Sequence, residues 1–321
     1  MTIVYTSAFK NLLEQTMSAG CSDIIPIIRL GRFRFLLLGL VLYLLGALLA
    51  ACSGCPLHTG KLAIGYLILV TGHLSMHYSN DLFDYEADLH TNPNAVSGGS
   101  GILRDYPHLR LAALYIALCL AAFSIVTGAV FTWYYSYPPA YIGLVIFSNL
   151  LGWYYAAPPV RLSYRGLGEI ATVLGVGVLM PAAGALTIAG SVPPAFLVFL
   201  PVLVLYSTSF ILSVELPDME ADRAAGKRTF IARKGRSAGL VLIAGANLLA
   251  TIYLLFLWLI TAQALYLVAS LVSVLLLVAG LLGIARRPTA GVAAAGFAKM
   301  SVGCFMVFLV AMDVSIAAFL R

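Results

Sequence analysis

Residues 77–104 read HYSNDLFDYEADLHTNPNAVSGGSGILR, and this stretch sets a dense cluster of acidic side chains directly after an apolar run. Asn80, Asp84 and Asp88 are spaced four residues apart. On a helix, this spacing puts three oxygen-bearing side chains on one face. Such ligands suit a hard cation like Mg²⁺, which keeps waters and completes its shell with phosphate oxygens. The stretch therefore predicts a magnesium site that acts on a phosphate-containing ligand.

A second acidic motif lies further along the chain, in SVELPDMEADRAAGKRT at 213–229. Asp218 and Asp222 are again four apart, and each follows its counterpart in the first motif by 134 residues. Lys227 and Arg228 come next, so that acids able to hold a metal are followed by bases able to hold phosphate. Two such stripes facing one another would hold a metal-bound diphosphate between them.

The composition is that of a helical membrane protein. Of the 321 residues, 61% are hydrophobic and 10% are charged, and the mean hydropathy is +0.98. A spanning helix needs about 20 apolar residues. We therefore expect a single all-α domain over 1–321, with 1–30 lying on the cytoplasmic side or in the membrane interface. Its nine transmembrane helices are expected at 35–52, 62–79, 111–131, 138–156, 169–190, 194–214, 238–260, 264–284 and 297–320.

The basic residues predict the orientation of these helices. In the nine-helix arrangement, 17 of the 19 Lys and Arg residues fall in loops on one side, and only Lys61 and Arg321 fall on the other. Since Lys and Arg collect in cytoplasmic loops, the N-terminus and both acidic motifs are expected on the cytoplasmic side of the cell's inner or plasma membrane. The net charge of +6 then reflects topology and gives no reason to expect nucleic acid as a partner.

Several further polar residues fall in the same layer as the acidic motifs. His77 shares the helical face of Asn80, so it is expected to line the cavity, whereas the deeper His73 is a weaker candidate for chemistry. Arg161 and Arg165 are expected near the phosphate or, equally, as ordinary cytoplasmic flanking residues. For a general base the candidates are Asp81, Glu215 and His77.

Two other features receive no functional role. Cys52 and Cys55 form a C-x-x-C, but without a second pair nearby they are expected to be two small residues near a helix end. Asp313 is expected in the outer half of the last span, where it can hydrogen-bond within the bundle.

The two motifs together resemble those of the UbiA superfamily of intramembrane prenyltransferases, and the resemblance covers essentially the whole chain. YRGLGEI at 164–170 and DRAAGKRT at 222–229 look most like the menaquinone branch, the 1,4-dihydroxy-2-naphthoate polyprenyltransferases. The resemblance implies nine helices around a central cavity, with Mg²⁺ and a polyprenyl diphosphate held by both Asp motifs and the isoprenoid tail leaving towards lipid. It also implies that Tyr155 and Arg161 lie near the diphosphate.

One departure concerns the acceptor. The menaquinone branch usually carries an Asn-Asn pair and an Arg just before its second Asp motif, where this chain has Val214, Glu215 and Pro217. The expected function is Mg²⁺-dependent transfer of a polyprenyl group to an aromatic acceptor resembling 1,4-dihydroxy-2-naphthoate, in quinone biosynthesis. Alternatives keep the same ionisation with another acceptor (4-hydroxybenzoate, a lipid alcohol or a tetrapyrrole) or with terpene cyclisation. A lipid-binding scaffold or a transporter is the non-enzymatic alternative.

The residues expected to form the site fall into three groups. The predicted metal ligands are Asn80, Asp84, Asp88, Asp218 and Asp222. The predicted catalytic residues are the four aspartates among them, with Asp81 and Glu215. The residues expected to bind the diphosphate are Asn80, Lys227, Arg228, Arg161, Tyr155 and Arg165.

Overall fold

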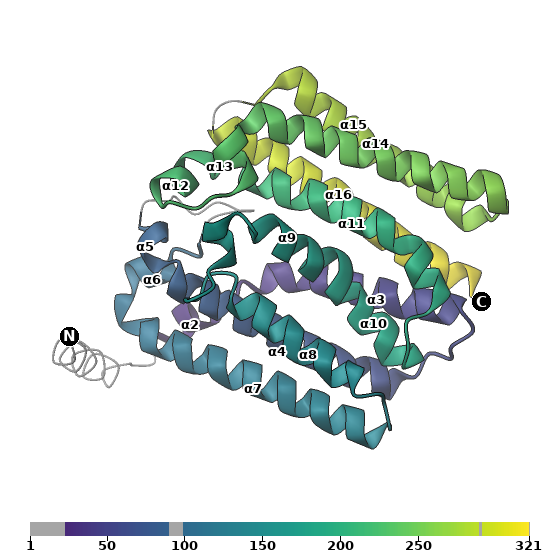
Figure 1. The fold of residues 1–321 in the computed structure, drawn as a ribbon, viewed down its shortest axis with the longest axis horizontal. Coiled ribbons are helices and arrows are strands. Elements are labelled where there is room, and N and C mark those ends of the chain that lie inside the picture. The colour runs from purple at the N-terminus through teal and green to yellow at the C-terminus, as the bar shows by residue number, and fades with distance from the viewer. Residues whose placement is uncertain (1–22, 90–98, 289–290, 321) are drawn as a thin grey trace.

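The computed structural model describes residues 23–89, 99–288 and 291–320, and within these ranges the regular secondary structure is entirely helical (Figure 1). The longer helices are α3 (Leu36–Cys52), α4 (Thr59–Phe83), α7 (Arg110–Tyr134), α8 (Ala140–Trp153), α10 (Met180–Ala189), α11 (Pro194–Glu215), α14 (Arg236–Thr261), α15 (Ala264–Arg286) and α16 (Gly291–Phe319). The short ones are α2 (Ile24–Leu30), α5 (Tyr85–Asp88), α6 (Ile102–Asp105), α9 (Gly168–Thr172), α12 (Met219–Ala224) and α13 (Phe230–Lys234).

All nine predicted apolar stretches fall in helical segments, but their suitability as membrane spans differs. Among the described residues, seven helical segments are long and apolar enough to cross a membrane. The other two are α4, which carries polar residues such as His73 and Asn80 in its second half, and α8, which has only 14 residues. The predicted span 169–190 is composite, because a π-helical segment, Val173–Leu179, joins α9 to α10. A π-helical turn inside an α-helix often marks a functional site.

The long helices pack lengthwise, and their short helical extensions gather at one end. α4 packs along α7, α3 along α10, and α14 along both α11 and α15. Figure 1 shows α5, α6, α12 and α13 together at the left end of the bundle. Since α5 also contacts α12, the two acidic motifs lie beside one another although they are far apart in the sequence.

The acidic stripes differ from the predicted continuous helices, because the helix is interrupted within each stripe. α4 ends at Phe83 and α11 at Glu215, and both Asp84 (φ −91°, ψ 5°) and Asp218 (φ −90°, ψ 0°) lie just outside a helix. The Asp88 N–H still donates to the Asp84 carbonyl, and the Asp222 N–H to the Asp218 carbonyl, both at 2.8 Å. The four-residue spacing therefore survives, while the break redirects the chain at the first Asp of each motif.

Two glycines allow α3 and α10 to approach closely. A Cβ on Gly46 would lie 1.8 Å from the Pro181 carbonyl oxygen, and a Cβ on Gly184 would lie 1.8 Å from that of Tyr43. Both obstacles are backbone atoms, which cannot move aside as a flexible side chain can. Small residues at such positions are the usual way in which membrane helices pack backbone to backbone.

We predict that Gly46→Ala lowers stability by about 1–3 kcal/mol, the usual cost of overpacking a core. The matched control is Gly245→Ala in α14, where a Cβ would meet no atom within 4 Å. Thermal unfolding of the purified proteins in detergent should give a lower Tm for Gly46→Ala only. Equal Tm values for the two variants would contradict the close α3–α10 contact.

Candidate active site

A polar cavity of about 190 Å³ lies at the end of the bundle where the acidic motifs meet. Of the sequence-predicted site residues, those that line it are Asn80, Asp81, Asp84, Asp88, Tyr155, Glu215, Asp218, Asp222 and Lys227. Six of these are carboxylates, and the cationic side chains in the lining are Lys227 and Arg32. The cavity therefore has a strong excess of negative charge.

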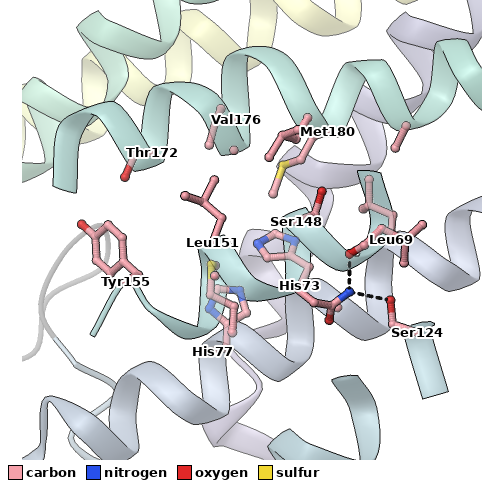
Figure 2. Close-up of a pocket in the computed structure, with 18 of the residues that line it drawn as sticks. Leu69, His73, His77, Ser124, Ser148, Leu151, Tyr155, Thr172, Val176 and Met180 are labelled. Carbon is pink, nitrogen blue, oxygen red and sulfur yellow. Dashed lines mark hydrogen bonds between the residues drawn. The ribbon is translucent and has the colours of Figure 1, made fainter. Parts of the chain in front are cut away.

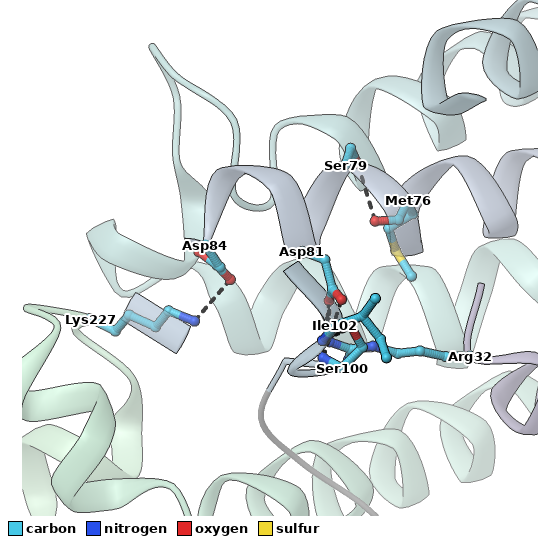
Figure 3. A network of polar contacts seen from close by, with 8 residues as sticks. All are labelled: Arg32, Met76, Ser79, Asp81, Asp84, Ser100, Ile102 and Lys227. Atoms are coloured by element: carbon cyan, nitrogen blue, oxygen red, sulfur yellow. Dashed lines mark hydrogen bonds and ion pairs between the residues drawn. The ribbon is translucent and has the colours of Figure 1, made fainter. Parts of the chain in front are cut away.

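Lys227 joins the second motif to the first (Figure 3). Its Nζ donates to Asp84 Oδ2 at 2.9 Å, and the Tyr164 hydroxyl donates to Asp84 Oδ1 at 2.8 Å. The Lys227 N–H also donates to the Asp222 carbonyl at 2.8 Å. Burial lowers the pKa of Lys227, but Asp84 and Asp222 raise it by more, so its net pKa lies above the usual lysine value. Lys227 is thus a fixed positive charge between the two motifs.

The second Asp of each motif is protonated more readily than an ordinary aspartate. Burial raises the pKa of Asp88 to about 7, with Asp81 adding to the shift and Lys227 opposing it. Burial likewise raises the pKa of Asp222 to about 6, although Lys227 opposes the shift and Thr229 donates a hydrogen bond to Asp222 Oδ2 at 3.1 Å. A cation bound between these carboxylates would favour their charged forms.

Asp81 is held at the edge of the cavity by contacts from two other segments (Figure 3). It is buried and forms an ion pair with Arg32, and the Ser100 N–H donates to its Oδ2 at 3.2 Å. Its carboxylate therefore ties α4 to the segment before α3 and to the end of the glycine-rich stretch. Gly99 lies so close to Asp88 that a Cβ there would approach Oδ2 within 1.6 Å, so a larger residue would displace the Asp88 carboxylate.

Two buried polar groups in this cavity are left unsatisfied by the described residues. Both carboxylate oxygens of Glu215, and Oδ1 of Asn80, are buried without a hydrogen-bond partner there. A buried polar atom without a partner costs free energy, so such atoms indicate a place for a ligand. Glu215 ends α11, and Asn80 lies near the end of α4. Each of these two helix ends therefore supplies one side chain with an unsatisfied buried oxygen.

The three predicted arginines do not line the cavity. The Arg161 guanidinium stacks on the Tyr164 ring, with Cζ 3.7 Å from its centroid, and can act on the site through Tyr164. Arg165 is exposed and donates to the Pro159 carbonyl at 2.9 Å, and Arg228 is exposed. Arginines beside a membrane are common for topological reasons, so sequence alone does not separate these from site residues.

Tyr164, Thr229 and Arg32 contact the acidic residues of the site, and sequence analysis assigned none of them to it. Tyr164 hydrogen-bonds Asp84, and Thr229 both donates to Asp222 and accepts from the Ala232 N–H at 3.2 Å, which caps α13. Tyr164 belongs to the stretch 164–170 and Thr229 to the stretch 222–229, which carry the family resemblance. The resemblance therefore included these residues, but it did not indicate what they bind.

A second, largely apolar cavity of about 300 Å³ adjoins the polar one (Figure 2). The two share Arg32, Asn80 and Tyr155 as lining residues. Its walls come from α3, α4, α8 and the π-helical segment, and they include Leu69, His73, His77, Leu151 and Val176. A ligand with a charged head and an apolar body would fit across the shared boundary.

The donor set fits a cation that completes its shell with ligand oxygens and water. Within the described ranges, no three His, Cys, Asp or Glu side chains converge on a single point. Mg²⁺ is usually bound by one or two carboxylates together with substrate phosphates. Asp84 and Asp88 on one wall, and Asp218 and Asp222 on the other, supply such pairs.

Comparison with known protein families shows which family the chain belongs to. The profile of the UbiA prenyltransferase family matches residues 37–309. The chain therefore belongs to the UbiA prenyltransferase family of membrane enzymes. A comparison with curated protein sequences gives no match.

Solved structures share this fold at low sequence identity. A UbiA homologue from Archaeoglobus fulgidus bound to DMAPP and Mg²⁺ has a TM-score of 0.63 and 16% identity, covering 90% of this chain and 98% of that one. A structure of digeranylgeranylglyceryl phosphate synthase has a TM-score of 0.66 and 16% identity, covering 92% and 99%. A UbiA homologue from Aeropyrum pernix K1 has a TM-score of 0.57 and 15% identity, covering 84% and 96%.

We predict that acids inside the cavity and acids beside it behave differently in a prenyl-transfer assay. Asp88→Asn and Asp222→Asn should lower the rate by about 100-fold or more, because each removes a charge that faces the ligand. Glu86→Gln and Glu220→Gln are the matched controls, since Glu86 is exposed and Glu220 pairs outside the cavity with Arg236 at 2.7 Å. The controls should stay within about twofold of wild type. Equal losses for all four variants would contradict the site.

Proposed function

We propose that the protein transfers a polyprenyl group from a polyprenyl diphosphate to an aromatic acceptor resembling 1,4-dihydroxy-2-naphthoate, with Mg²⁺, in quinone biosynthesis. The observation that carries this proposal is the junction of the two cavities. A diphosphate suits the acidic, metal-binding cavity with Lys227, and an isoprenoid tail suits the adjoining apolar one. The A. fulgidus homologues bound to DMAPP or to GPP, each with Mg²⁺, support the same donor class.

The residues of the chain have separable tasks in this reaction. Each carboxylate pair, Asp84 with Asp88 and Asp218 with Asp222, would hold a divalent cation, with Asn80 Oδ1 as a further oxygen ligand. Bound there, Mg²⁺ would supply Lewis-acid chemistry to the diphosphate leaving group. Lys227 offsets the charge that develops on that group, and Tyr164 keeps the Asp84 carboxylate in place. The apolar wall around Leu151 and Val176 keeps water from the allylic carbon.

Arg32 supports an acceptor that carries a carboxylate. It lines both cavities, and its Nε is buried without a hydrogen-bond partner in the described chain, although its guanidinium also pairs with Asp81. A carboxylate on the acceptor would meet this donor at the boundary where the allylic carbon lies. The stretches YRGLGEI and DRAAGKRT favour the naphthoate type among such acceptors.

Glu215 has two possible tasks, because it lines the polar cavity near the second motif with both oxygens unpartnered. It can accept a hydrogen bond or a proton from the acceptor, or it can serve as a further metal ligand. Glu215→Gln separates them. The first task lowers kcat while Mg²⁺-dependent binding of the donor is retained, and the second weakens donor binding as well.

We further propose that the single domain crosses the cell's inner or plasma membrane nine times, with α4 and α8 as the two spans beyond the seven apolar ones. The 17 Lys and Arg residues on the side of the acidic motifs support a cytoplasmic N-terminus and cytoplasmic active-site loops.

We predict that purified protein given geranyl diphosphate, 1,4-dihydroxy-2-naphthoate and Mg²⁺ forms a prenylated product detected by mass spectrometry. EDTA, Asp84→Ala and Asp218→Ala should each abolish product formation, because each removes the cation or its ligands. Full turnover in EDTA would refute the metal mechanism. If the protein prenylates another acceptor and not 1,4-dihydroxy-2-naphthoate, the proposed acceptor is wrong.

We predict that cysteines placed at Asp105 and Lys234 are labelled from the cytoplasm, and a cysteine at His58 from the opposite side. The background is a cysteine-free variant in intact cells, labelled with a membrane-impermeant maleimide. If positions 105 and 234 react from opposite sides, the two acidic motifs cannot share one site.

A further inference from the structure

Two histidines lie in the wall of the apolar cavity, inside α4, and the proposed donor chemistry does not use them. His73 and His77 are one turn apart, with ring centroids 4.7 Å from each other, and both line the cavity (Figure 2). His73 Nδ1 and His77 Nε2 are buried and have no hydrogen-bond partner among the described residues. An ionisable side chain inside a span is costly unless it faces a cavity and serves a ligand.

Packing explains where the His73 ring lies, but it does not explain why a residue with hydrogen-bonding nitrogens is present there. Gly39 of α3 leaves room for this ring, because a Cβ at Gly39 would lie 3.0 Å from His73 Nδ1. The His73 ring contacts the His77 ring at a tilt of 34°, and the Phe35 ring lies 5.9 Å from His77 with a similar tilt of 39°. His77 is therefore held between two rings, so its orientation is fixed before a ligand arrives.

His77 lies close to the place where the reaction must occur. Asn80, which follows it by about one turn of α4, lines both cavities, as do Arg32 and Tyr155. A donor with its diphosphate in the polar cavity and its tail in the apolar one has its first carbon at this boundary. The acceptor atom that attacks this carbon must lie beside it, within reach of the apolar wall that His77 helps to form.

We propose that His77 hydrogen-bonds a hydroxyl group of the acceptor, and that His73 is the positioning residue that holds the His77 ring. This inference rests on the proposed prenyl transfer and specifies its acceptor as a hydroxylated ring. Two imidazoles at this separation in apolar surroundings oppose double protonation. A neutral imidazole has one donor and one acceptor nitrogen, which matches a hydroxyl group, itself both donor and acceptor. A site built for a hydroxyl discriminates strongly against molecules that lack one.

The test uses the purified full-length protein, Mg²⁺ and geranyl diphosphate, with 1,4-dihydroxy-2-naphthoate, 4-hydroxybenzoate and homogentisate as acceptors. His77→Phe keeps an aromatic ring between Phe35 and His73 but removes the hydrogen bond. We expect it to raise the KM for the accepted compound by roughly tenfold. The KM for geranyl diphosphate and the Tm should stay at their wild-type values.

Three further variants separate recognition from packing. His77→Gln, which retains hydrogen-bonding groups, should recover part of the acceptor KM. His73→Phe, which keeps the stacking partner, should change that KM less than His77→Phe does. Leu67→Met, an apolar change at an exposed residue of α4 that lines neither cavity, is the matched control and should leave both KM values unchanged.

The outcomes distinguish this inference from the proposed function. A wild-type acceptor KM in His77→Phe would overturn the inference while prenyl transfer stands. Wild-type release of diphosphate with no product from any of the three acceptors would also overturn it, because a hydroxylated aromatic ring would not be the acceptor. Failure of the wild type to release diphosphate at all would overturn the proposed function itself.

Discussion

The repulsion among six carboxylates around one small cavity is the constraint on which the rest of the site depends. Lys227 and Arg32 are the cationic side chains in the cavity lining, and each is already paired with an aspartate. Buried like charges raise one another's pKa and destabilise the folded protein unless a counter-charge is present. Divalent cations would supply that charge, and they would complete their shells with oxygens of the diphosphate.

The fold meets this constraint by bringing two helix ends together. α4 ends one residue before Asp84 and α11 ends three residues before Asp218, and the short helices α5 and α12 carry the second aspartate of each pair. The apolar bodies of the same helices remain in the bundle, where residues such as Phe199 and Phe308 form the core. Acidic groups therefore collect at one end, while the interior behind them stays apolar enough to take an isoprenoid chain.

Much of this arrangement could be predicted from sequence, because its signals are long or repeated. Each of the nine apolar stretches contains a helix, as hydropathy indicates, and both motifs were expected on the same side of the bundle. The helix break at Asp84 could not be predicted, since the chain keeps its four-residue hydrogen bonds through it. The break at Asp218 has a sequence signal in Pro217, which has no N–H to donate, and there the Asp218 N–H donates to the Glu215 carbonyl three residues back.

The contacts from loops were also beyond sequence analysis. Tyr164 reaches Asp84 only because tertiary packing brings its turn to the end of α4, and no local pattern encodes that approach. Arg165 and Arg228 had the right charge in the right layer, yet both are exposed. Arginines beside a membrane serve orientation as well as ligand binding, so their number says little about which of them face the cavity.

The central claim is that both acidic motifs hold one metal–diphosphate unit. A double-mutant cycle tests it most directly, by titrating the unreactive analogue geranyl S-thiolodiphosphate into wild type, Asp84→Asn, Asp218→Asn and the double variant, with and without Mg²⁺. We expect each single variant to lose most of the Mg²⁺-dependent binding energy, and the double variant to lose little more than either, because the losses share one ligand. Strictly additive losses, or Mg²⁺-dependent binding that survives in Asp218→Asn, would contradict the shared site.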